Sequence, residues 1–138
     1  MYEILKHAHS GLRWVVLFAL LFAIFNAFSG KSSKPVNLLA LISTHIQLIL
    51  GLVLYFISPL VQFGSGVMKN SVLRFYTVEH ISLMLVAIAL ITIGYSKAKR
   101  ADSQANAAKK IRLFYLIGLI LILISIPWPF RGLGGGWF

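Results

Sequence analysis

Four long apolar runs constrain this 138-residue chain more than any other feature of its sequence. Each is close to the roughly 20 residues that a helix needs to cross the hydrocarbon core of a bilayer. The runs cover approximately residues 4–28, 36–57, 71–95 and 110–126. Backbone groups inside lipid must be hydrogen-bonded within the protein, and the runs lack the alternating pattern of barrel strands. The sequence therefore predicts an all-α fold, a four-helix transmembrane bundle with up-and-down topology.

The composition supports a membrane protein and excludes several other classes. Hydrophobic residues make up 59% of the chain and charged residues 12%, whereas about a quarter of the residues in soluble domains are charged. The absence of cysteine excludes disulfides, cysteine-ligated zinc, iron–sulfur clusters and thiol catalysis. We expect a single transmembrane domain over residues 1–138. Its last part includes a flexible glycine-rich tail at 132–136.

Thirteen lysines and arginines against three acids give a formal net charge of +10. The cations lie between the apolar runs instead of along one face, so we expect no nucleic-acid partner. One side of the predicted bundle has five cations and the other has eight: Lys31, Lys34, Lys97, Lys99, Arg100, Lys109, Lys110 and Arg112. The positive-inside rule makes the richer side cytoplasmic, where its cations meet anionic lipid. This predicts a bacterial inner-membrane protein with both termini on the non-cytoplasmic side.

Polar side chains within the apolar runs are candidate functional residues, because burying them in a membrane is costly. His9 and His80 are each expected about two turns below the same end of the bundle, on parallel, diagonally placed helices. His45 is expected about 14 Å in from the opposite end. His7 points to nearly the opposite face from His9, so we set it aside as interfacial. By helical periodicity, His80 shares its face with Leu73, Tyr76, Thr77, Leu83, Met84, Ala87, Ile91 and Gly94.

Neutral imidazole is the commonest protein ligand for metals, and bundles build cofactor sites in their cores. Because the chain has no cysteine and only three methionines, haem ligation here would use two histidines. His9 and His80 are the better-placed pair, although helix tilt leaves a pairing with His45 open. Arg13, one turn deeper than His9 on the same face, is expected to attract a haem propionate or act as another electrostatic partner.

Three segments, 9–14, 44–47 and 77–80, resemble small bacterial four-helix membrane proteins described as cytochrome b-like. A more remote resemblance is to the four-helix halves of haem A synthase and to cytochrome b561-type bundles. The resemblance implies b-type haem with bis-histidine ligation, and electron transfer with quinol or a redox partner. The chain departs from these families in its fourth run, which has no histidine, so its ligands suffice for one haem.

These observations predict a membrane b-type cytochrome-like protein that binds one haem b through two of His9, His45 and His80. Its expected activity is electron transfer, with quinone and a larger redox complex as candidate partners. Six-coordinate iron has no open position, so we expect no substrate turnover at the metal. One alternative is a copper or zinc site formed by all three imidazoles. The other is a cofactor-free accessory subunit whose histidines only pack.

Overall fold

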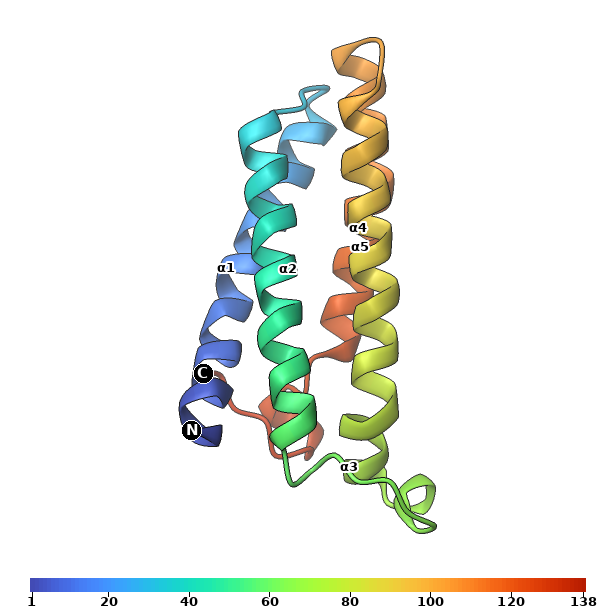
Figure 1. Cartoon of the computed structure of the whole chain (residues 1–138). Helices are drawn as coiled ribbons and strands as arrows, with labels where there is room; N and C mark the ends of the chain where they lie inside the picture. Colours follow the sequence, from blue (N-terminus) through green and yellow to red (C-terminus); the bar gives the residue numbers. More distant parts are fainter.

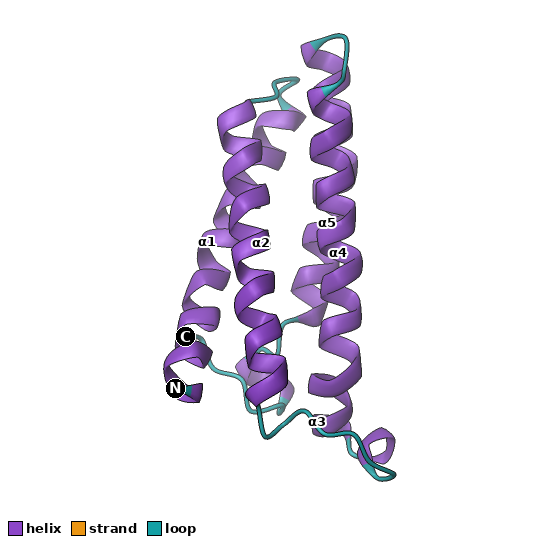
Figure 2. Ribbon diagram, viewed as in Figure 1, coloured by secondary structure: helices purple, strands orange, loops and turns teal.

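The computed structural model describes residues 1–138. Its four long helices are α1 (Tyr2–Phe28), α2 (Lys34–Ile57), α4 (His80–Lys99) and α5 (Gln104–Ser125). Consecutive long helices run in opposite directions, and both termini lie at the same end of the bundle (Figure 1). Loops and short helical turns connect the long helices, and there are no strands (Figure 2). The all-α, four-helix architecture predicted from the sequence is confirmed.

Four short elements lie at the end of the bundle that holds the termini. The connection after α2 contains η1 (Val67–Lys69), and η3 (Pro129–Arg131) follows α5. The other two, α3 (Ser71–Arg74) and the π-helical turn η2 (Phe75–Glu79), lead directly into α4. The third apolar run is therefore one helical rod from Ser71 to Lys99, four residues longer than the predicted range of 71–95.

Local sequence explains where the long helices begin and end. Gly30, with φ of 78°, follows α1 in a left-handed conformation that glycine adopts without a Cβ clash. Pro35 lies in the first turn of α2, where its missing N–H is not needed. At the start of α5, the Ser103 side chain accepts a hydrogen bond from the Asn106 N–H. Pro127 lies two residues beyond the last residue of α5.

Three rods are long and apolar enough to cross a membrane: Tyr2–Phe28, Lys34–Ile57 and Ser71–Lys99. Their outward faces are apolar as well, since Phe18, Phe22 and Phe25 of α1 are all more than half exposed. A helix that is apolar on every side suits a membrane better than water. α5 is not among the three rods because Lys109, Lys110 and Arg112 occupy its first turns. The fourth span expected at 110–126 is helical, but the helix begins six residues earlier and ends one residue sooner, at Gln104–Ser125, and its membrane crossing stays a prediction.

Small residues bring the helices close together in the core. A Cβ atom added to Gly118 of α5 would lie 2.7 Å from Cγ1 of Ile91 in α4. The Tyr115 hydroxyl is fully buried and donates a 2.8 Å hydrogen bond to the Asn37 carbonyl of α2. α4 packs mainly on α5, and α1 packs on α2 and α5. α1 and α4 are therefore diagonal neighbours, as the up-and-down topology predicts.

Candidate cofactor site

Two of the three predicted site histidines meet across the bundle. The ring centroids of His9 on α1 and His80 on α4 are 6.3 Å apart, and the ring planes are inclined by 74°. Their helices pack on other neighbours and barely on each other. The two imidazoles therefore bridge the space between diagonal helices, near the end of the bundle that holds both termini.

The π-helical turn η2 sets the direction of the His80 side chain. A π turn contains an extra residue, which shifts the face of the helix after it. The turn brings Phe75, five residues before His80 and 2% exposed, against the imidazole with ring centroids 5.7 Å apart. Regular periodicity had instead placed Leu73 and Tyr76 beside His80. That part of the predicted face assumes an uninterrupted α-helix, which the π turn does not provide, so it stays a prediction.

Hydrogen bonds from the neighbouring segments accompany this turn. The Tyr55 hydroxyl of α2 donates to the Thr77 carbonyl at 2.7 Å. The Gln62 N–H, in the connection after α2, donates to the Thr77 hydroxyl at 3.0 Å. Outside partners thus satisfy polar groups of a turn in which regular α-helical bonding is interrupted. The turn is accompanied by tertiary contacts that cannot be predicted from the local sequence.

His80 forms a hydrogen bond to a backbone carbonyl through one of its two ring nitrogens. Its Nδ1 atom lies 2.7 Å from the Ser125 carbonyl oxygen at the end of α5. Since a carbonyl only accepts, Nδ1 carries the proton and Nε2 carries the lone pair. Nε2 has no hydrogen-bond partner within the protein. Ligating histidines commonly donate their second ring N–H to a backbone carbonyl in this way. Sequence reasoning missed Ser125, because a backbone acceptor leaves no trace in residue type.

α2 holds His9 from the other side. The Gln47 side-chain amide donates a 2.7 Å hydrogen bond to the His9 backbone carbonyl. One turn further along α2, Gly51 leaves room for the ring, since an added Cβ would lie 3.1 Å from His9 Cε1. Within this cradle, His9 Nδ1 and Gln47 Oε1 are both buried without a hydrogen-bond partner. Unpaired buried polar atoms of this kind cost about 1–3 kcal/mol each and are rare in folded proteins.

Arg13 is 7% exposed and binds the chain's own C-terminal segment. Its Nη2 atom donates to the carbonyls of Gly136 and Trp137, at 2.9 and 2.7 Å. The guanidinium also lies over the rings of Trp14 and Trp128, 5.6 and 5.5 Å from their centroids. The glycine-rich tail is thus fixed to α1, contrary to the flexible tail expected from its composition. Arg13 Nε remains buried without a partner, so a propionate role for this residue stays a prediction.

His45 does not join the other two histidines. Its Nδ1 atom lies 2.8 Å from the Leu41 carbonyl of its own helix. His45 precedes Gly51 by six residues, which is about 9 Å along the axis of α2 from the level of the His9 ring. No group of three or more His, Cys, Asp or Glu side chains that could hold a metal ion is present. The structure therefore does not bring together the three imidazoles of the expected copper or zinc alternative.

The remaining charged side chains near the pair have other partners. Glu79, the acid next to His80 in sequence, forms a 2.9 Å ion pair with Arg74. His7 is exposed, with Nε2 3.9 Å from the Glu3 carboxylate, which agrees with its interfacial assignment. The site therefore consists of two imidazoles facing each other, and the Glu3 and Glu79 carboxylates bind other side chains.

No protein-family model, curated protein or solved structure matches the chain. What the fold and site define is a small helical bundle with an opposed pair of histidines near one end.

Proposed function

We propose that the protein is a membrane-embedded b-type cytochrome that binds one haem between His9 and His80 and transfers electrons. The observation that carries the proposal is the opposed imidazole pair on two diagonal helices of an apolar bundle. A metal–imidazole bond is about 2.0–2.1 Å, and each ring nitrogen lies about 1.1 Å from its ring centre. At the observed centroid separation of 6.3 Å, one ring nitrogen of each histidine could reach a metal ion held between them.

Each proposed ligand has its own support within the chain. The Ser125 carbonyl fixes the His80 tautomer and leaves Nε2 free to ligate. Gln47 and Gly51 hold the backbone and the ring of His9 in place from α2. When bound, haem supplies a one-electron couple, and two histidine ligands leave no open coordination position. The chain's role is accordingly to hold, orient and insulate the cofactor instead of binding a substrate at the metal.

Membrane insertion is part of the proposal and rests on the apolar rods and the charge distribution. Eight cations lie at the end of the bundle formed by the α1–α2 and α4–α5 connections, and five lie at the end that holds the termini. The positive-inside rule then places the first end in the cytoplasm of a bacterial cell and both termini outside it. The histidine pair, near the termini, would face the outer leaflet, with quinone or a larger redox complex as its electron partner.

The proposal is tested by the optical spectrum of the protein purified in mild detergent from cells supplied with a haem precursor. We expect reduced-minus-oxidised bands of a low-spin b-type haem, with about one haem per chain by pyridine haemochrome assay. Well-folded protein without such bands would instead support the cofactor-free accessory subunit. Elemental analysis on the same sample reports copper or zinc if a different metal is bound.

A further inference from the structure

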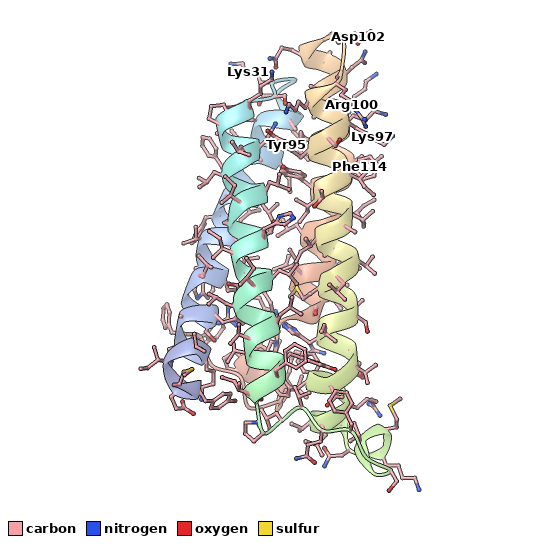
Figure 3. The ribbon with its side chains drawn as sticks, in the orientation of Figure 1. Lys31, Tyr95, Lys97, Arg100, Asp102 and Phe114 are labelled. Atoms are coloured by element: carbon pink, nitrogen blue, oxygen red, sulfur yellow. The ribbon has the colours of Figure 1, made fainter.

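The end of the bundle opposite the termini carries most of the protein's charge. Eight cations and one acid, Asp102, lie there, so this end contributes 8 − 1 = +7 of the net +10. The structure's ion pairs all lie at the other end, where they involve Lys6, His7 and Arg74. The eight cations are thus without carboxylate partners. Lys97 and Arg100 project from the outer side of α4 at this end, and Lys31 lies on the neighbouring loop (Figure 3).

Four of the eight cations surround one recess at the α4–α5 turn. The recess has a volume of about 520 Å³, and its charged lining comprises Lys97, Arg100, Lys109, Lys110 and Asp102. Asp102 accepts a hydrogen bond from the Asn106 side chain, which also lines the recess. Lysine and arginine donors converging on one space are the groups that bind phosphate oxygens in proteins. The recess therefore has the chemistry of a phosphate site.

A stripe of exposed apolar side chains continues from the recess along α5. Leu113, Ile117, Ile120 and Ile124 are each between 41% and 56% exposed. Spacings of three and four residues place them on one helical face, below Lys109 and Lys110. A soluble phosphate is much smaller than the recess and would also leave this stripe uncovered. A phospholipid would use both, with its phosphate among the cations and an acyl chain against the stripe.

We propose that this recess is a binding site for the phosphate of an anionic phospholipid whose acyl chain lies along the exposed face of α5. Anionic lipids are attracted to juxtamembrane lysines and arginines at the cytoplasmic surface, where the charge distribution places this end. The lipid would also anchor α5, the one long helix whose first turns are too charged to count as an apolar span. The inference rests on membrane insertion, and it is independent of the haem.

The test is native mass spectrometry of the purified full chain, titrated with phosphatidylglycerol or with phosphatidylcholine of identical acyl chains. We expect phosphatidylglycerol to bind more tightly. The double variant Lys109→Gln/Lys110→Gln should weaken that binding by about thirtyfold, because each lysine near an anionic surface contributes about fivefold. The variant Lys109→Arg/Lys110→Arg should retain it. The matched control is Lys31→Gln/Lys34→Gln, which removes two charges from the same end but none from the recess, and we expect a change of about twofold or less.

Three results would overturn the proposal: equal binding of the two lipids, equal losses in the two glutamine variants, or complete displacement of phosphatidylglycerol by inorganic phosphate. The last result would identify a soluble phosphate as the ligand. Alkaline carbonate extraction of cell membranes separates this inference from the proposed function. Extraction of the wild-type protein would contradict membrane insertion, whereas retention in the membrane without lipid preference would contradict the lipid site alone.

Discussion

His9 and His80 face each other across the bundle, and each is supported by a helix that is not its own. Ser125 of α5 binds the His80 ring, and Gln47 of α2 binds the His9 backbone. The two rings gain little from each other, because an edge-on aromatic pair is worth about 0.5–1.5 kcal/mol beyond its buried area. Buried polar atoms left unpaired cost at least as much. The proposal of a ligand shared by the two rings rests on this arrangement.

Gln47 is expected to position His9 for ligation. Replacing it in Gln47→Leu removes the 2.7 Å hydrogen bond to the His9 carbonyl, and we expect haem affinity to fall by about 10–100-fold, the usual cost of losing support around a ligand. Titration of the haem-free protein with haemin, followed at the Soret band, measures the change. Gln104→Leu is the matched control, since Gln104 bonds Ser32 at the opposite end of the bundle. Equal affinities in the two variants would remove Gln47 from the site.

Gly51 is expected to be required for the position of the His9 ring. An added Cβ would already press on His9 Cε1 at 3.1 Å, so the larger side chain in Gly51→Val should displace the ring and lower haem occupancy severalfold. Haem content per purified chain reports the effect. Gly11→Val introduces the same residue into a helix where nothing lies within 4 Å of the added Cβ. If both variants lose haem to the same extent, helix propensity and not the ring contact is responsible.

Arg13 is expected to hold the C-terminal tail on the bundle. Arg13→Leu removes the donor to the Gly136 and Trp137 carbonyls, so the last residues should be released from α1. Carboxypeptidase digestion with mass analysis should then trim the variant several times faster than the wild type, because cleavage follows the population of the open form. The control is Lys6→Leu, since Lys6 lies on the same helix and pairs with Glu3 instead of the tail. Unchanged trimming of Arg13→Leu would show that the other contacts secure the tail, among them the 2.7 Å hydrogen bond from Trp14 Nε1 to the Trp137 carbonyl.

Gly118 is expected to be a close-packing position between α4 and α5. Gly118→Ala places a Cβ 2.7 Å from Ile91 Cγ1, and overpacking of this kind costs about 1–3 kcal/mol. Thermal unfolding in detergent measures the loss. The double variant Gly118→Ala/Ile91→Ala should lose less stability than the sum of its single variants, because removing Cγ1 relieves the clash. Strict additivity would mean that the two positions do not touch.

The apolar helices were predictable from the sequence because their signal is local. Apolar content and run length give the spans, and Pro35 and Pro127 limit two of them. Depth and helix direction favoured His9 and His80 as the pair but left His45 open, and the structure brings the first two rings together. The π turn before His80 was not predictable, since it accompanies hydrogen bonds to Thr77 from Tyr55 and Gln62.

Contacts made through backbone atoms also could not be predicted from the sequence. Ser125 acts through its carbonyl, which every residue has. Arg13 carries a charge that pointed to an anionic partner, yet the structure gives it the carbonyls of Gly136 and Trp137. A glycine-rich segment has no side-chain pattern from which its docking could be read. The polar network of the site therefore had to come from the structure.

The central claim is tested most directly by the electron paramagnetic resonance spectrum of the oxidised protein, compared with single alanine variants of the three histidines. The account predicts a low-spin, six-coordinate haem signal in the wild type and in His45→Ala. It predicts loss of that signal in His9→Ala and in His80→Ala, with the chain still folded by circular dichroism. Retention of the low-spin signal in either of these two variants, or its loss in His45→Ala alone, would contradict haem ligation by the His9–His80 pair.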